Sequence, residues 1–364
     1  MRPSVFAAAT LAALVLAALA PAVAAGGTRG PAPAPGLLDV GLPAQPVRDV
    51  VIGGWPAALR AGLSASEQRY PVNDGKGRTV AIAVSPLCNP VTCNAADPRR
   101  IAEFLGTLVH GSEISSLTVE LVTTSEISNR CGFGAGACYF PADGRMLING
   151  SDTTGPDGAT RDFVIAHEYG HHVERHRLNP PFGSALDWGT KRWATYERVC
   201  QGVRRGAYFP GDEGEHYFQN PGEAFAEAFA FNRFRRAPVR WAWSDSLEPG
   251  RESFRALRAD TLHPWRHRTR FELTGRVGER VGAMAVKRFR APLDGVLSVR
   301  LSAVRGSQLD LLLRDRRGRL LASSRSTGAR EQVNFVVCGQ ARLRAAVERR
   351  GAGAGAFTLV VRRP

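Results

Sequence analysis

The sequence predicts a chain in two parts, an α+β region over residues 78–262 and an all-β sandwich over residues 268–364. Two observations lead to this division. The first part mixes short apolar runs of strand length with longer segments whose apolar residues recur at helical spacing. After His267 the pattern changes to short alternating apolar segments separated by glycine and aspartate turns, which is typical of a β-sandwich.

The elements can be placed along the chain from these patterns. In the first part we expect strands at 79–84, 117–122 and 146–149. We also expect a helix that Asp97 caps and Pro98 opens, with apolar residues at helical spacing from Ile101 to Val109. A helix of about four turns should begin after Thr160 or Asp162 and stop before Asn179-Pro180-Pro181. Another helix should run from Glu223 to Phe231. The sandwich should contain strands at 296–301, 309–313 and 357–361.

The N-terminal segment has the layout of a secretory signal peptide, residues 1–25. Arg2 precedes a mostly apolar stretch from Val5 to Ala20, and small residues follow it. The stretch is short for a membrane span, and no later segment is apolar enough, so we expect an exported protein with no span. Residues 26–77, which are Pro-rich at 31–46, are expected to form a linker or pro-segment.

Six cysteines agree with an oxidising, extracellular compartment, where disulfide bonds persist. Two pairs are close in sequence and a third would tie the two parts together: Cys88–Cys93, Cys131–Cys138 and Cys200–Cys338. The even count supports pairing, but the connectivity stays open because the sequence alone does not fix it.

The positive charge is concentrated in the second part. Residues 251–364 hold 25 Lys/Arg and 9 Asp/Glu, so this stretch accounts for the whole formal charge of +15. All but one of these basic residues are arginine. A basic surface attracts anionic partners, and an anionic cell-wall polymer is the partner we expect. An ordinary solvated surface is the alternative. We expect no nucleic-acid partner.

The segment His167-Glu168-Tyr169-Gly170-His171 carries the clearest chemical signal. Side chains four residues apart lie on the same face of a helix, so His167 and His171 can bind one ion. A catalytic zinc takes three protein ligands and keeps a position for water, from which Glu168 could remove a proton as general base. The sequence therefore predicts a zinc hydrolase.

The third ligand must come from elsewhere in the chain. A ligand in the extended pattern H-E-x-x-H-x-x-G-x-x-H would need His at 177, where Arg177 stands, and His176 is one residue out of register. Glu223 lies on the predicted second helix and can complete a His₂Glu site. Glu227 lies one turn further on and can orient a zinc-bound histidine through its far nitrogen.

These two motifs resemble those of the Glu-zincin peptidases, and the phrase Glu223-Ala-Phe-Ala-Glu227-Ala-Phe is similar to that of the lethal-factor type. The resemblance implies a zincin-like catalytic domain with His167, His171 and Glu223 as zinc ligands and Glu168 as base. It also implies a tyrosine that donates to the oxyanion, for which Tyr217 is the candidate and His216 its competitor. A substrate-binding strand at 146–150 follows from the same resemblance; a plain core strand is the alternative.

The C-terminal part, with its short alternating apolar segments and glycine-rich turns, resembles the small jelly-roll domain attached to secreted bacterial peptidases. Together these features predict a secreted zinc-dependent endopeptidase in which Glu168 activates zinc-bound water for attack on a peptide carbonyl. Two alternatives remain: a secreted cell-surface binding protein with an inactive zincin fold, and a zinc amidase acting on peptidoglycan. Aromatic residues between the two helices, such as Trp188, Trp193 and Tyr208, could wall a substrate cleft or pack the loop onto the domain.

Overall fold

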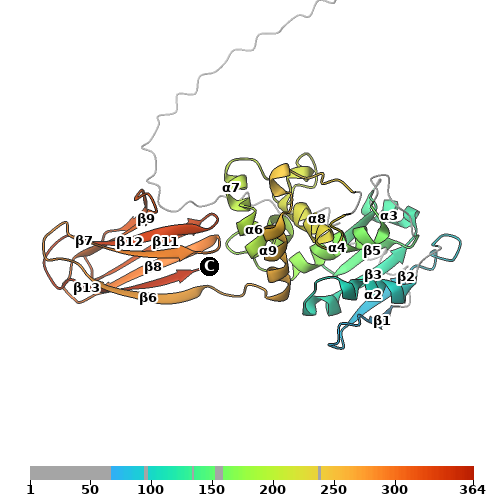
Figure 1. Ribbon diagram of the computed structural model, residues 1–364, viewed down its shortest axis with the longest axis horizontal. Helices are drawn as coiled ribbons and strands as arrows, with labels where there is room; N and C mark the ends of the chain where they lie inside the picture. The colour runs from blue at the N-terminus through green and yellow to red at the C-terminus, as the bar shows by residue number, and fades with distance from the viewer. Residues whose placement is uncertain (1–66, 94–96, 133–134, 152–158, 237–238) are drawn as a thin grey trace, which may run out of the picture. The chain divides into compact units, whose positions relative to one another are not determined.

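The computed structural model describes residues 67–93, 97–132, 135–151, 159–236 and 239–364 (Figure 1). All of these belong to one compact unit, Leu37–Pro364. The predicted signal peptide and the predicted linker up to residue 66 lie outside the described residues. Within the described ranges, no helix combines the length and the apolar character that crossing a bilayer requires.

The first part is an α+β region built on a five-stranded sheet with the order β1-β2-β3-β5-β4. The three inner strands are parallel and lie where the sequence predicted them, at Thr79–Val84 (β2), Thr118–Val122 (β3) and Arg145–Asn149 (β5). The edge strands Gln68–Pro71 (β1) and Ala137–Phe140 (β4) run antiparallel to their neighbours. The sheet thus includes a strand before Arg78, where the sequence predicted a linker, because β1 pairs with β2 through its backbone and needs no apolar pattern.

Two helices of this region lie between strands in the sequence, and the others follow the last strand of the sheet. Their bounds are Pro98–Thr107 (α2), Thr124–Cys131 (α3), Arg161–Arg175 (α4), Ala185–Trp188 (α5), Lys191–Tyr196 (α6), Val199–Arg204 (α7), Pro221–Arg233 (α8) and Arg251–Leu262 (α9). Short 3₁₀ turns lie at Ser112–Ser116 (η1), Tyr217–Gln219 (η2) and Asp245–Leu247 (η3).

Two of these helices, α4 and α8, carry the predicted motifs, and both begin at side-chain caps. Thr160 accepts a hydrogen bond from the Phe163 amide, so Thr160 and not Asp162 is the N-cap of α4. Asn220 caps α8 and Pro221 occupies its first position, where the missing amide hydrogen costs nothing.

The contact between α4 and α8 is exceptionally close at Gly170. A Cβ atom placed on Gly170 would lie 2.7 Å from the Cα of Ala226 and 3.1 Å from its carbonyl oxygen. Glycine is therefore required at this point, since any side chain would push the two helices apart. Tyr169 and Phe229, which are buried beside it, pack their rings edge to face across the same interface.

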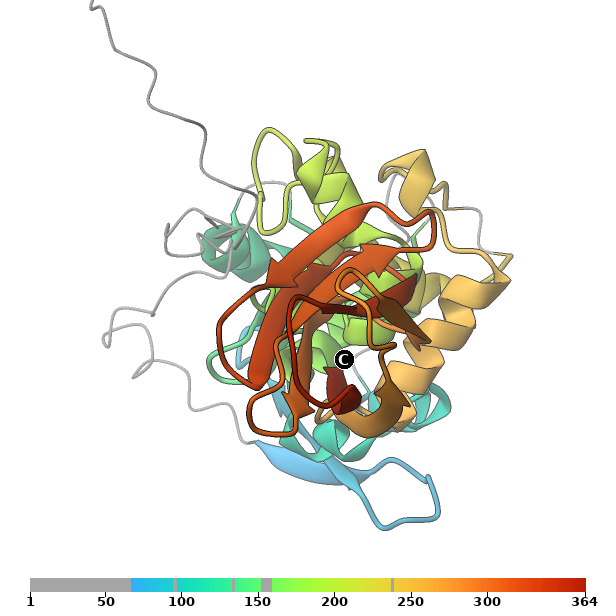
Figure 2. The same cartoon turned by 90° about the vertical axis from the view of Figure 1, so that its left-hand side faces the viewer.

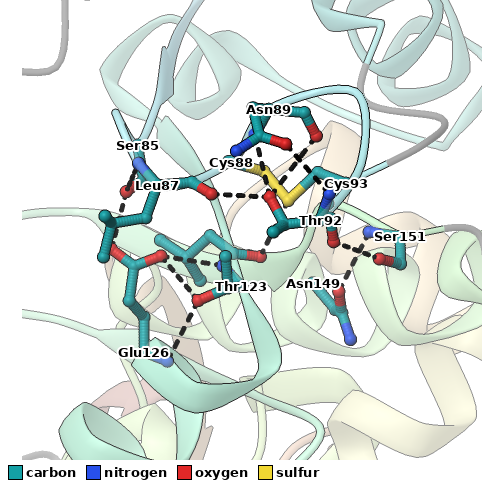
Figure 3. Close-up of a disulfide and its surroundings, with 12 residues drawn as sticks. Ser85, Leu87, Cys88, Asn89, Thr92, Cys93, Thr123, Glu126, Asn149 and Ser151 are labelled. Carbon is teal, nitrogen blue, oxygen red and sulfur yellow. Dashed lines mark hydrogen bonds between the residues drawn. A yellow bond between two sulfur atoms is a disulfide. The ribbon is translucent and has the colours of Figure 1, made fainter.

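The three disulfides suggested by the sequence are present: Cys88–Cys93, Cys131–Cys138 and Cys200–Cys338. Figure 3 shows the first of them, which closes the loop after β2. Beside it the buried carboxylate of Glu126 accepts hydrogen bonds from the Ser85 hydroxyl at 2.6 Å and from the Thr123 amide at 2.8 Å. The loop is thus tied to the start of α3.

The second part is a β-sandwich, as the alternating pattern predicted. Its two antiparallel sheets have the orders β10-β9-β12-β7 and β11-β8-β13-β6 (Figures 1 and 2). Buried side chains from both sheets form a separate hydrophobic core. The strands are Thr269–Arg276 (β6), Met284–Ala291 (β7), Gly295–Ala303 (β8), Leu309–Asp315 (β9), Leu320–Ser324 (β10), Arg330–Val337 (β11), Ala341–Arg349 (β12) and Ala356–Arg363 (β13).

Specific contacts join the sandwich to the helices that precede it. Besides the Cys200–Cys338 disulfide, the fully buried Lys191 places its ammonium 3.5 Å from the carboxylate of Asp294, which also accepts a hydrogen bond from Thr195 at 2.8 Å. A buried charge needs such a partner, so α6 and the β7–β8 turn depend on each other.

Candidate metal centre

The structure brings the three predicted ligands together, His167 and His171 from α4 and Glu223 from α8. Their ligand atoms all lie within 4.8 Å of one another. The Glu223 carboxylate faces both histidines: one oxygen is 3.3 Å from Nε2 of His167, and the other is 3.3 Å from Nε2 of His171. A tetrahedral ion with bonds of about 2.0–2.1 Å separates its ligand atoms by about 3.3 Å, so the three groups fit an ion of that size.

Each histidine is oriented by a second carboxylate at its other nitrogen. Glu227, the residue that the sequence analysis suggested for this position, lies 3.0 Å from Nδ1 of His167. Glu174 lies 3.2 Å from Nδ1 of His171 and was missed. Its position three residues after His171 on the same helix was the available signal. Both carboxylates leave Nε2 of the histidine free to face the site.

The electrostatics of the group favour positive charge. Burial alone would lower the pKa of His167, but its hydrogen bonds with Glu223 and Glu227 outweigh burial and raise that pKa to about 10. Burial would raise the pKa of Glu223, yet the charges of His171 and His167 and the hydrogen bonds from both histidines hold it well below its usual range. Carboxylates that stabilise positive charge on the two histidines in this way also attract a metal cation, which competes with protons for the histidine nitrogens.

Glu168 lies beside this group and is buried, with 7 % of its surface exposed. Burial raises the pKa of its carboxyl, and the nearby histidine charges offset only part of this effect. A carboxylate whose pKa is moved toward neutrality is a better general base at neutral pH.

Tyr217 and His216 occupy different surroundings. The Tyr217 hydroxyl donates a hydrogen bond to Glu223 at 2.9 Å. Burial and the Glu223 charge raise its pKa, so it stays a proton donor. His216 instead lies 2.8 Å from Asp212 and stacks on Phe209, away from the histidines of the site.

A cavity of about 180 Å³ opens onto the site. Its walls combine the motif residues with side chains that the sequence did not single out as site residues: Cys131, Ala135, Ala137, Cys138, Tyr139, Leu186 and Glu213. Four of these come from β4 and the disulfide beside it. Trp243 also stands near, with its ring centroid 6.0 Å from those of His167 and Tyr217.

The structure decides between the alternatives that the sequence left open for the strand at 146–150 and for the aromatic residues between the two helices. The strand at 146–150 cannot pair with an extended peptide, because β5 is hydrogen-bonded to β3 on one side and β4 on the other. It is a core strand, and β4 is the edge beside the cavity. The aromatic residues Trp188, Trp193 and Tyr208 are buried in the core, so they pack the segment onto the domain.

The other two histidines of this segment, His172 in α4 and His176 at its C-cap, do not belong to the three-ligand group. His172 is fully buried, takes a hydrogen bond from the Tyr139 hydroxyl at Nδ1 and donates from Nε2 to the Glu113 carbonyl. Burial lowers its pKa to about 4, which keeps the ring neutral. His176 lies 3.1 Å from the Ser116 hydroxyl.

Comparison with known proteins gives weak likenesses. No family model matches this chain, and no curated protein sequence matches it. A solved pre-peptidase C-terminal domain of a collagenase from Bacillus anthracis is similar at 17% identity and a TM-score of 0.21, covering 25% of this chain and 87% of that domain. The structure of IMPa from Pseudomonas aeruginosa in complex with an O-glycopeptide is similar at 13% identity and a TM-score of 0.16, and the likeness covers 68% of this chain. The chain spans 34% of the length of that second protein.

Proposed function

We propose that this chain is a secreted zinc-dependent endopeptidase. The observation that carries the proposal is the joint placement of His167, His171 and Glu223 at spacings that fit a tetrahedral ion, with Glu168 in the same cavity. The three disulfides support an oxidising, extracellular location, to which residues 1–25 would direct the chain.

In this proposal His167, His171 and Glu223 hold zinc, which when bound supplies a Lewis acid that polarises a carbonyl and lowers the pKa of water. Glu168 takes the proton from the attacking water and returns it to the leaving amine. Tyr217 donates a hydrogen bond to the oxygen on which negative charge develops. Each of the three roles belongs to a residue that lines the cavity.

The substrate in this proposal is a peptide in extended conformation beside β4. Its residues Ala137, Cys138 and Tyr139 line the cavity, and in the described sheet this strand pairs only with β5. An extended peptide can pair with such an edge through backbone hydrogen bonds, which places a peptide carbonyl near the site without demanding particular side chains.

The experiment that tests this function measures bound zinc and cleavage of a mixed peptide library by the full chain and by its Glu168→Gln variant. We expect about one zinc in both proteins and a fall in turnover on the order of 10²–10⁴-fold in the variant, the usual contribution of a general base. The same substitution at the exposed Glu215 is the matched control and should leave turnover unchanged.

Three results would contradict the proposal. Near-normal cleavage by the Glu168→Gln protein would remove Glu168 from the chemistry. Zinc binding without cleavage of any peptide would favour a binding protein with an inactive zincin fold. Cleavage confined to peptidoglycan stems would make the protein an amidase.

A further inference from the structure

One sheet of the β-sandwich carries an array of arginines on its outer side. In the register of β7, β12 and β9, Arg288 lies opposite Arg344, and Arg344 lies opposite Arg314. One step along the strands, Arg290 lies opposite Arg342. Arg316, which follows β9, lines the same hollow as this second pair. We call these six residues the arginine face, and Figure 1 shows their three strands side by side.

The geometry of the array follows from the sheet. Neighbouring strands lie about 4.8 Å apart, and residues two apart on one strand are separated by about 6.7 Å. The arginine side chains therefore start from a grid with these two spacings, all on one side of the sheet.

In the described part of the chain, the arginine face lacks acidic partners. Among the residues that the structure describes, none of the six forms an ion pair with an aspartate or glutamate, whereas Arg319 beside them pairs with Asp315 at 3.2 Å. The side chain of Arg314 donates to the Gly318 carbonyl. Like charges placed directly opposite each other on a sheet destabilise it, so the fold itself gains nothing from this arrangement. A ligand with matching negative charge would relieve the repulsion.

The surface over the arginine face is hollowed. Two adjoining hollows of about 370 and 520 Å³ share Arg290, Arg316 and Arg342 in their walls. The first also exposes parts of Phe289 and Leu343 between the arginines. The result is a basic depression that extends across more than one row of the grid, which suits an elongated ligand better than a single small anion.

We propose that the arginine face binds a linear extracellular polymer whose units are joined by phosphodiesters. Charge complementarity favours a polyanion, because six cations stand together without an acidic partner among the described residues. Arginine at all six positions, with no lysine among them, favours phosphate, whose oxygens match the planar guanidinium fork. The site is separate from the metal centre and goes beyond the proposed peptidase function, since it would hold the protein on a surface.

The test uses the full chain and fluorescently labelled poly(glycerol phosphate) at physiological salt, with binding measured by anisotropy. The variant replaces three exposed members of the face: Arg288→Gln, Arg290→Gln and Arg342→Gln. We expect saturable binding by the wild-type protein that weakens as salt rises. The triple variant should bind about tenfold more weakly, since each exposed ion pair contributes roughly twofold to threefold.

The matched control removes the same number of charges from α9 through Arg251→Gln, Arg255→Gln and Arg258→Gln, which are also exposed. It should keep the wild-type affinity. Thermal unfolding provides a second readout: the variant of the arginine face should melt at the same temperature as the wild type or higher, because it relieves like-charge repulsion.

Several outcomes would overturn the inference. No binding of poly(glycerol phosphate), or equal weakening by both triple variants, would reduce the arginine face to general surface charge. Equal or tighter binding of polygalacturonate would reject phosphate as the recognised group. Tighter binding of a single-stranded oligodeoxynucleotide would assign the face to a nucleic acid instead.

Discussion

The carboxylate of Glu227 offers the sharpest test of how the metal centre is held. Glu227 is 3 % exposed and lies 3.0 Å from Nδ1 of His167, so it fixes the ring with Nε2 facing the site. The proposal predicts that zinc affinity depends on Glu227 although it is not a ligand.

The expected loss of zinc affinity depends on which interaction with His167 each substitution at Glu227 keeps. Partners of this kind change metal affinity by about 10–100-fold, or about 1.4–2.7 kcal/mol. Glu227→Gln keeps an oxygen that can accept the hydrogen bond but removes the charge. A charge-assisted hydrogen bond is roughly twice as strong as a neutral one, so we expect about tenfold weaker zinc binding. Glu227→Ala removes the bond altogether and should approach the hundredfold limit of about 2.7 kcal/mol.

The assay is competition for zinc against a chromogenic chelator at neutral pH, which needs no substrate. Glu174→Gln should behave like Glu227→Gln, because Glu174 holds His171 at 3.2 Å. Glu126→Gln is the control: Glu126 is also buried and hydrogen-bonded but does not line the cavity. Wild-type zinc affinity in a folded Glu227→Ala protein would refute the reasoning.

Three further predictions concern residues around the site. Tyr217→Phe should lower kcat by about 10²–10³-fold with little change in KM or zinc content, as removal of an oxyanion donor does; loss of zinc would show instead that the hydroxyl serves Glu223. The folded state holds His172 with a pKa of about 4, below the ordinary 6.5, so this contribution to stability is complete above pH 6.5 and is lost as pH falls toward 4. Urea unfolding should lose about 2 kcal/mol between pH 7 and pH 5 through this group, and a His172→Gln variant should lose less. Asp294→Ala should destabilise the protein by about 3–5 kcal/mol, because it leaves the buried Lys191 charge without its carboxylate. A smaller urea midpoint change in the double variant with Lys191→Met would support this cause.

The parts of the fold that the sequence predicted are those with a strong periodic signal. The strands at 79–84 and 117–122 are buried apolar runs, and the sandwich strands alternate visibly between apolar and polar residues. The edge strands β1 and β4 escaped prediction because each has four residues and pairs on one side only. These two strands are held by backbone hydrogen bonds, which leave no pattern of apolar and polar side chains in the sequence.

Some residues of the candidate site could likewise be predicted from the sequence, and others could not. The spacing of His167 and His171 fixes their shared face on any helix, so their proximity could be predicted without coordinates. Tyr217 and His216 could not be told apart, since the 3₁₀ turn at Tyr217–Gln219 decides which ring reaches Glu223. Glu174 was missed, although it lies three residues after His171 on the same helix and is buried against that histidine.

The absent side chain at Gly170 has a consequence for which ion the proposed site would accept. Two donors belong to one rigid helix and the third to another, and the helices touch backbone to backbone one residue before His171. Main-chain contact therefore sets how far apart the two backbones that carry the donors lie, and rotamer changes move the donor atoms only within that spacing. In the proposed site, calcium, with bonds of about 2.3–2.6 Å, would need its donor atoms further apart than zinc, with bonds of about 2.0–2.1 Å. In the proposed site, selection by ionic radius would thus depend on the contact between α4 and α8. A single methyl group at Gly170 would change that contact, and with it the spacing of the donors, without altering any ligand residue.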